Sequence, residues 1–394
     1  MSPAPVPAPS SRSALARAWR EEMPLDPGVV FLNPGTLGGT LRRALDEGER
    51  LRRAWVAEGA GGALDAPGAD AYERMRRAAD GVRRAFADWL GCGRRHVALT
   101  GNATDGVHHA LASIDWRPGD RVISTDQEHE ALSRALDRLA ARRGVVVDRV
   151  PFPEGEEDGA LARAVAARLT DRTRLVAFSH VSCRTGVTAD VAGVARAVAG
   201  HGALVLVDGA HGAGTRWPLL AEGVDFYAFP GHKWLFGPVG TGVLWVSARA
   251  LEETEPLLAG APSAGEDGRD LDGMDGAWRY EAGTRDWAAV AALGTALAFR
   301  RRWREEEIVA HYLSLGEAFR RGLGGRWTVL GAGPLLLLAM AEEEAWSVAR
   351  AAWRRRRMVV KATPLGIRVS LGPWWTEEEA EGAAAALAGA AAEA

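Results

Sequence analysis

From about residue 70 to residue 246, short apolar runs alternate with amphipathic helical stretches. Short apolar runs separated by helices are typical of a mostly parallel sheet that helices cover on both faces. The pattern therefore predicts an α/β fold. The first expected helices cover residues 72–90 and 107–114, and the expected strands end at Leu99 or cover residues 121–124, 144–150, 175–179, 203–207, 226–229 and 242–246.

The alternation stops at residues 257–276, a stretch rich in glycine and acidic residues that we interpret as a loop leading out of a first domain. We expect a smaller α+β domain to follow. Its expected elements are helices at 288–306, 311–323 and 343–356, a strand at 333–340, strands near 358 and 367, and a final Glu/Ala-rich helix. The predicted divisions are a disordered tail (1–13), an N-terminal segment joining the active site (14–40), a large domain (41–260) and a small domain (261–394).

Composition and charge exclude several classes of protein. The 394 residues carry a formal net charge of −3 with acids and bases interspersed, which argues against nucleic acid or an anionic membrane as a partner. Cys92 and Cys183 are the only cysteines, so we expect no disulfide framework and predict no metal site. No apolar run approaches the roughly 20 residues that span a bilayer. The N-terminus lacks the features of a secretory signal, so we expect a cytoplasmic protein.

Two unusual polar residues follow expected strands. Asp208 comes directly after the run 203–207, and Lys233 lies just beyond the run 226–229. Ligands of open parallel sheets bind beyond the carboxyl ends of the strands. A lysine there can form a Schiff base with a carbonyl cofactor, and a buried carboxylate can keep a pyridine nitrogen protonated. Together the two residues predict a site for pyridoxal phosphate.

A phosphate group needs hydrogen-bond donors, and a helix N-terminus supplies them. The run Thr-Gly-Asn-Ala-Thr-Asp-Gly at 100–106 opens the helix that follows Leu99, and His232 adds a further donor. Taken singly, each of these residues also fits a plain structural role. Asp208 fits a helix cap or a metal ligand, Lys233 fits a solvated surface, and the run fits a capped turn. Their shared position at strand ends favours one common site.

Four stretches between residues 175 and 246 carry a resemblance to a known family: SHVSCRTG, LVLVDGAHGAG, DFYAFPGHKW and GPVGTGVLWV. With the run at 100–106, they resemble the class V aminotransferases, which are pyridoxal-phosphate enzymes of fold type I. The Asp-Gly-Ala-His and His-Lys-Trp runs look most like the isopenicillin N epimerase branch, with cysteine desulfurases more distant. The resemblance extends from residue 31 to residue 370.

The resemblance implies roles around the cofactor. Lys233 would form the Schiff base, Asp208 would pair with the ring nitrogen, and His129 would stack on the ring. His211 would lie near the phenolic oxygen, and Ser182 would hydrogen-bond nearby. The phosphate would be held by Asn102, Ala103, Thr104 and His232, with Thr284 reaching the phosphate of the partner subunit. That last role implies a homodimer with shared active sites.

The resemblance implies a small-molecule amino-acid substrate, whose side chain the sequence does not identify. Arg368 matches the arginine that binds the α-carboxylate, for which a planar guanidinium is suited. Asn33 belongs to an N-terminal loop that closes on the substrate, and Arg285 is also assigned to substrate binding. Desulfurases carry a nucleophilic cysteine in the C-terminal domain, whereas this chain has no cysteine after Cys183. A persulfide-forming desulfurase is therefore not expected.

Several reactions remain open once Lys233 has removed the α-proton as general base. We favour β-elimination, with cleavage of the C–S bond of an S-conjugated cysteine in secondary metabolism, because Lys233 can serve both proton transfers. Epimerisation needs a second acid that the sequence does not identify, and decarboxylation coupled to oxidative deamination is a further alternative. A non-enzymatic alternative is a phosphate-binding α/β protein in which Lys233 only contacts an anion.

Overall fold

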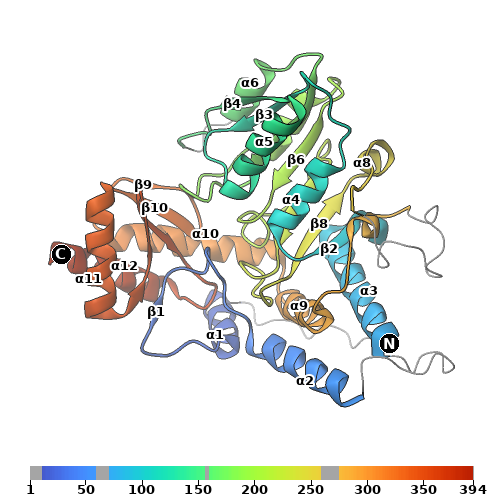
Figure 1. Cartoon of the computed structure of the whole chain (residues 1–394). Coiled ribbons are helices and arrows are strands. Elements are labelled where there is room, and N and C mark those ends of the chain that lie inside the picture. The colour runs from blue at the N-terminus through green and yellow to red at the C-terminus, as the bar shows by residue number, and fades with distance from the viewer. Residues whose placement is uncertain (1–10, 59–70, 156–158, 259–274, 394) are drawn as a thin grey trace.

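The computed structural model describes residues 11–58, 71–155, 159–258 and 275–393 (Figure 1). Its largest element is a seven-stranded sheet of order β2-β8-β7-β6-β5-β3-β4, in which β2 to β7 run in the same direction and β8 runs antiparallel to its neighbours β2 and β7. The sheet confirms the predicted, mostly parallel α/β architecture. Its strands are β2 (Val97–Thr100), β3 (Arg121–Thr125), β4 (Val146–Val150), β5 (Thr173–Ser179), β6 (Leu204–Asp208), β7 (Phe226–Pro230) and β8 (Gly242–Val246).

Both faces of this sheet are covered by helices because successive strand residues point to opposite sides. In β6, Leu204 and Leu206 pack in one core cluster, while Val205 and Val207 pack in another. The first face is covered by α4 (Ala103–Ala112), α5 (Glu130–Arg143) and α8 (Ala248–Glu253). The second face is covered by α3 (Ala71–Leu90), α6 (Ala160–Ala166), α7 (Val191–Val198) and α9 (Trp287–Arg300). Short 3-10 helices cover Arg94–His96 and Ala277–Tyr280.

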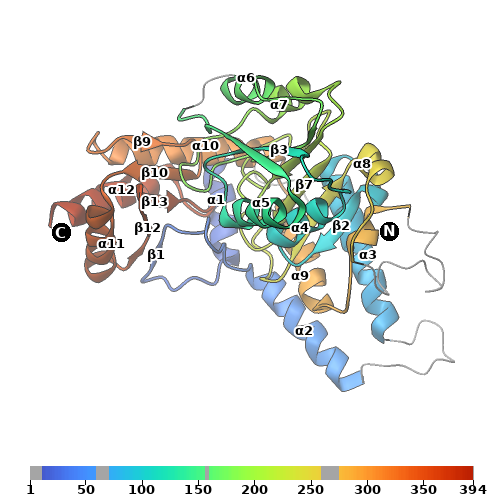
Figure 2. The same cartoon turned by 45° about the horizontal axis from the view of Figure 1, so that its top comes forward.

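A second unit at the C-terminal end contains a four-stranded antiparallel sheet of order β12-β13-β10-β9 (Figure 2). This is the α+β arrangement that the sequence predicts. Its strands are β9 (Val329–Leu330), β10 (Leu335–Ala339), β12 (Lys361–Thr363) and β13 (Gly366–Ser370). Its helices are α10 (Glu305–Gly322), α11 (Glu342–Arg356) and α12 (Glu377–Ala392). Within the described ranges, no helix combines the length and hydropathy needed to cross a bilayer.

The N-terminal segment packs against this C-terminal unit. Helix α1 (Arg12–Glu22) buries Trp19 in the same core cluster as α10 and α12, and Arg20 pairs with Glu379 of α12. Strand β1 (Val30–Phe31) runs parallel to β11 (Met358–Val359), and α2 (Arg42–Glu58) packs on α9. Helix α1 begins at Arg12, so the last two residues of the tail expected at 1–13 are helical. Residues 1–10 and most of the loop expected at 257–276 lie outside the described residues.

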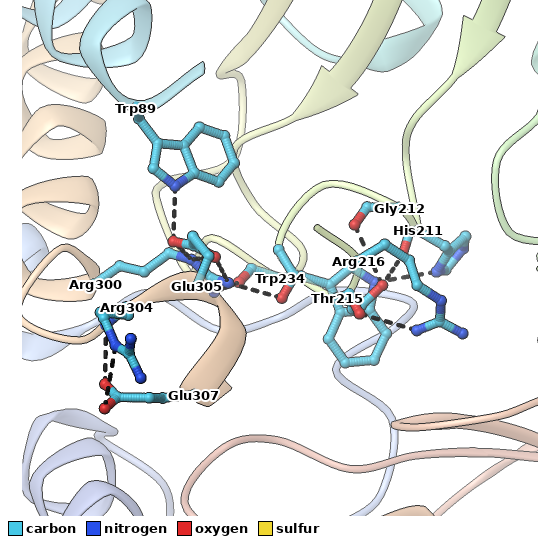
Figure 3. A network of polar contacts seen from close by, with 11 residues as sticks. Trp89, His211, Gly212, Thr215, Arg216, Trp234, Arg300, Arg304, Glu305 and Glu307 are labelled. Carbon is cyan, nitrogen blue, oxygen red and sulfur yellow. Dashed lines mark hydrogen bonds and ion pairs between the residues drawn. The ribbon is translucent and has the colours of Figure 1, made fainter. Parts of the chain in front are cut away.

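The prediction of one continuous helix over residues 288–306 is wrong, because the range contains the end of one helix and the start of another. Helix α9 ends at Arg300, and α10 begins at Glu305. The fully buried Arg300 pairs with Glu305 and donates hydrogen bonds to the carbonyls of Gly214 (2.9 Å) and Trp234 (3.3 Å) (Figure 3). Trp89 donates to the same carboxylate at 2.7 Å. These long-range contacts stabilise the break, and the local sequence does not encode them.

Candidate active site

A cavity of about 650 Å³ lies where the carboxyl ends of β6 and β7 meet the small antiparallel sheet. This is the edge at which open parallel sheets bind ligands, and the volume suits a small molecule. Its lining comes from four parts of the chain: the N-terminal segment at Gly35 and Thr36, the N-terminus of α4, the ends of β5, β6 and β7 with the residues after β3, β5, β6 and β7, and the strands β12 and β13 with the turn between them.

Lys233 and His211 face each other in this cavity. The Nζ of Lys233 lies 3.3 Å from the Nε2 of His211, while the indole N–H of Trp234 donates to His211 Nδ1 at 3.2 Å. Since Nδ1 accepts a hydrogen bond, the proton of a neutral His211 lies on Nε2, toward the lysine. Burial lowers the pKa of Lys233, and neighbouring cations add to this while Asp208 opposes it. Burial also lowers the pKa of His211 well below its usual value, so the imidazole is neutral.

Two buried carboxylates lie at the strand ends. Asp208 is the last residue of β6, only 4% exposed, and its Oδ1 accepts from the backbone N–H of Ala210 at 2.9 Å. Glu128 follows β3 and accepts hydrogen bonds from the hydroxyls of Thr125 and Ser179, both at 2.5 Å. Burial raises the pKa of Glu128 to about 7, against these hydrogen bonds, and the charge of Asp208 adds to the increase.

Glu128 is a site residue that the sequence prediction missed. It lines the cavity together with Asp208, and both carboxylates lie at the carboxyl end of a parallel strand, Asp208 as the last residue of β6 and Glu128 three residues after β3. That shared position, in the run Gln-Glu-His-Glu at 127–130, is the signal that could have identified Glu128.

His129 also lines the cavity and is the N-cap residue of α5. Its Nδ1 accepts from the backbone N–H of Ala131 at 3.1 Å. In the neutral ring the proton therefore lies on Nε2. Burial and the charge of Lys233 lower the pKa of His129, which favours this neutral form. A neutral aromatic ring at the cavity wall can stack on a planar ligand.

The phosphate residues predicted from the sequence lie together at one end of the cavity. Asn102 caps α4 by accepting from the backbone N–H of Asp105 at 2.9 Å, and Ala103 and Thr104 line the cavity beside it. The first turn of a helix offers unpaired N–H groups and a partial positive charge. The buried Nδ1 of His232 makes no hydrogen bond within the described part of the chain. These groups fit a phosphate and, with Lys233 and Asp208, fit pyridoxal phosphate.

Arg368 lies on β13 and reaches the cavity from the small sheet. Its guanidinium donates to the carbonyl of Cys183 at 2.9 Å, to the Thr36 hydroxyl at 2.5 Å and to the Asn33 side chain at 3.4 Å. The residue is only 4% exposed, yet its Nε has no partner among the described residues. The guanidinium is held in place by its neighbours and keeps donor capacity for an anionic ligand. Cys183 also lines the cavity, and burial raises the pKa of its thiol.

Ser182, predicted to lie beside the cofactor, is outside the cavity lining. Its fully buried hydroxyl donates to Gln127 at 3.1 Å and accepts the backbone N–H groups of Arg184 and Thr185. The hydroxyl therefore holds the turn that carries Cys183, and its hydrogen bond to a cofactor stays a prediction.

Arg285 and Thr284 also lie outside the cavity lining. Arg285 donates to the carbonyl of Leu99 and forms an ion pair with Glu281 at 3.7 Å, so its guanidinium is held at β2, and its role in substrate binding stays a prediction. Thr284 is exposed on the surface of the chain. A role for it at the phosphate of a partner subunit stays a prediction.

The comparisons with known proteins agree with this geometry. A family model described as aminotransferase class V matches residues 64–330. The chain is 30% identical to isopenicillin N epimerase of Streptomyces clavuligerus, over 94% of this chain and 97% of that protein. It is 34% identical to a probable cysteine desulfurase of Pseudomonas aeruginosa, but this match covers only 64% of each protein.

Two solved structures of C-DES are also similar. The first, a variant with glycine covalently linked to its pyridoxal-phosphate cofactor, has a TM-score of 0.84 and 26% identity, over 94% of this chain and 98% of that one. The second is the cystine C–S lyase C-DES with its reaction product cysteine persulfide. It has a TM-score of 0.81 and 26% identity, over 91% of this chain and 97% of that one.

Proposed function

The chain belongs to the class V aminotransferase family, and on this premise we propose that it is a pyridoxal-phosphate enzyme that cleaves the C–S bond of an S-substituted cysteine. The fold is that of the fold-type I enzymes. The observation that carries the proposal is the convergence of Lys233, Asp208 and Arg368 on one cavity, with Lys233 Nζ 3.3 Å from His211. The similarity to a C–S lyase over nearly the whole chain supports cleavage at sulfur.

Pyridoxal phosphate, when bound, accepts the electron pair released at the substrate Cα. The residues that would hold it are Asp208 at the ring nitrogen, His129 at the ring face, and the N-terminus of α4 with His232 at the phosphate. Asp208 is suited to this role because it is buried and a neighbouring N–H holds its carboxylate in place.

Arg368 and Lys233 would act on the substrate itself. Arg368 binds the α-carboxylate and thereby orients the Cα–H bond. Lys233 takes the α-proton, and its lowered pKa raises the fraction of neutral amine available as a base. The C–S bond then breaks with its electron pair on sulfur, and the Lys233 ammonium returns a proton to the departing thiolate. Thiol, pyruvate and ammonia are the products after hydrolysis.

Epimerisation is the second candidate, because the similarity to isopenicillin N epimerase covers 94% of the chain. It requires an acid on the face of the substrate opposite Lys233. Decarboxylation coupled to oxidative deamination is a third outcome at the same residues. A desulfurase acting through a C-terminal cysteine is not proposed, since no cysteine follows Cys183.

The first experiment tests the cofactor. The purified protein should be yellow, and borohydride should abolish its visible absorption band and fix the cofactor to Lys233, as peptide mapping would detect. Lys233→Ala should retain cofactor through the phosphate contacts and lose turnover. A colourless protein that cannot be reconstituted with pyridoxal phosphate would favour the phosphate-binding alternative.

A second experiment separates the reactions. S-Methyl-L-cysteine is incubated with the enzyme in deuterium oxide, and pyruvate, ammonia and thiol are measured together with deuterium at Cα. Pyruvate and thiol in equal amounts support the C–S lyase. Deuterium incorporation without pyruvate indicates epimerisation, and release of carbon dioxide indicates decarboxylation; either result contradicts the proposed cleavage.

A further inference from the structure

Lys361 is one of only two lysines in the chain and lies in the same cavity as the other, Lys233. It lies on β12 directly opposite Arg368 of β13 in the antiparallel register. Residues opposed in this way extend from the same face of the sheet, with Cβ atoms about 4.5–5.5 Å apart. Both side chains therefore enter the cavity from one wall. Like charges opposed across two strands are unfavourable in the absence of a counter-ion.

No protein carboxylate supplies that counter-ion within the described ranges. Three acids line the cavity: Asp208 ends β6, Glu128 lies between β3 and α5, and Glu130 begins α5, so none comes from the small sheet. None of them forms an ion pair with Lys361 in the described part of the chain. The charge of Arg368 adds to burial in lowering the pKa of Lys361, so the two cations repel each other.

The contacts of the two cations differ in a way that suggests separate roles. Arg368 is almost fully buried and held by Cys183 and Thr36. Lys361 is exposed at the cavity wall, where a flexible ammonium can follow a group of variable length. The exposed Arg184 lines the cavity as well, so the cavity contains cations from both units of the chain.

We propose that Lys361 forms a second anion subsite, beside the α-carboxylate site of Arg368, and that the substrates are S-substituted cysteines whose substituent ends in a carboxylate or sulfonate. The proposal rests on the proposed function and narrows its substrate class. The anion of the substituent would supply the counter-charge that the protein lacks at this wall.

The test compares two ligands of matched shape, S-carboxymethyl-L-cysteine and its neutral amide, S-carbamoylmethyl-L-cysteine. Binding is measured by calorimetry on Lys233→Ala protein loaded with pyridoxal phosphate, in which turnover is blocked. A charge-assisted hydrogen bond predicts a dissociation constant about tenfold lower for the carboxylate. Adding Lys361→Gln should make the two dissociation constants equal, because it weakens the binding of the carboxylate ligand and leaves that of the amide unchanged. Arg134→Gln, which removes an exposed charge of α5 outside the cavity lining, is the matched control and should preserve the tenfold ratio.

Two results would overturn the subsite. If Lys233→Ala protein with Lys361 intact binds the carboxylate and the amide ligand with equal affinity, the cavity wall does not recognise the charge of the substituent. Equal weakening of both ligands by Lys361→Gln would place Lys361 at the α-carboxylate instead. If neither ligand binds and the wild-type enzyme forms no thiol from any cysteine conjugate, the proposed function itself fails.

Discussion

Trp234 determines which ring nitrogen of His211 carries the proton, and the two rings pack edge to face. Its indole N–H donates to Nδ1 of His211, and the opposite ring nitrogen faces Lys233. The hydrogen bond therefore determines which nitrogen can donate toward the lysine. The sequence pattern identifies His211 and Lys233 as site residues, but the link through Trp234 depends on side-chain orientation.

Trp234→Phe should keep most of the packing and remove this hydrogen bond. Since one neutral hydrogen bond contributes about 1 kcal/mol, we expect kcat to fall roughly 2- to 10-fold while KM changes less than about twofold. Steady-state kinetics with an S-substituted cysteine measures both constants. Trp303→Phe is the matched control, because Trp303 is also buried but its indole N–H has no partner among the described residues. An equal loss of kcat in both variants would contradict a positioning role for Trp234.

Glu128 should make stability depend on pH. Its pKa is raised to about 7 in the folded protein, so the folded state favours the protonated carboxyl. The stability associated with that proton is complete below the usual pKa of 4.5 and is lost as the pH rises through about 7. The glutamine of the Glu128→Gln variant does not titrate, so this variant does not lose that stability as the pH rises. We expect the unfolding free energy of the cofactor-free variant, relative to wild type, to increase by about 3 kcal/mol between pH 4.5 and pH 8.

Urea unfolding at several pH values measures this difference. A difference between Glu128→Gln and wild type that stays constant from pH 4.5 to pH 8 would show that the Glu128 carboxyl does not titrate in this range. The measurement uses protein without cofactor. The protonated ring nitrogen of a bound pyridoxal phosphate, paired with Asp208, would change the charge next to Glu128 and so its pKa.

At the level of elements, the break between α9 and α10 fixes the loop that carries Lys233. Arg300, the last residue of α9, pairs with Glu305 and donates to the carbonyls of Gly214 and Trp234 (Figure 3). The turn after β6 and the turn after β7 are thereby held to one buried guanidinium. The apolar period of residues 288–306 gives no sign of this break, because its cause lies in residues about 65 to 85 positions away.

Glu305→Ala should be strongly destabilising because it leaves a buried, unpaired Arg300. We expect a loss of about 3–5 kcal/mol in the free energy of unfolding. Glu307→Ala is the control, since Glu307 pairs with the exposed Arg304 and caps α10, and should cost about 1 kcal/mol. Chemical denaturation of both variants provides the comparison. Similar losses in the two variants would mean that the buried pair contributes no more than a surface pair.

At the scale of the molecule, the two units are joined by the N-terminal segment as well as by the connection between α9 and α10. Trp19 of α1 packs in the C-terminal core with Phe299 and Phe236, from α9 and from the loop after β7. The boundaries predicted at residues 40 and 260 stay predictions. The shared core explains why sequence position alone does not indicate which unit a helix stabilises.

The predicted homodimer with shared active sites can be tested directly by changing the exposed Thr284. Thr284→Val should weaken cofactor binding, and co-expression with Lys233→Ala should restore activity at limiting pyridoxal phosphate. In a mixed dimer with shared sites, one site receives both wild-type residues, so random pairing gives about a quarter of all sites intact. Light scattering would establish the oligomeric state. A dimer without complementation would contradict the role of Thr284 in the partner's site.

The sequence by itself determined the layered α/β architecture and the positions of Lys233, Asp208 and the turn at residues 100–106 at the edge of the sheet. These depend on local information, since an apolar run defines a buried strand and the residues after it occupy the ligand-binding edge. Only the tertiary structure decided which distant groups face one another. It brought Glu128 to Asp208, placed Lys361 and Arg368 in one cavity with Lys233, joined Ser182 to Gln127 and tied Arg285 to the carbonyl of Leu99. Strand register and burial join residues far apart in the chain, so no local pattern specifies these contacts.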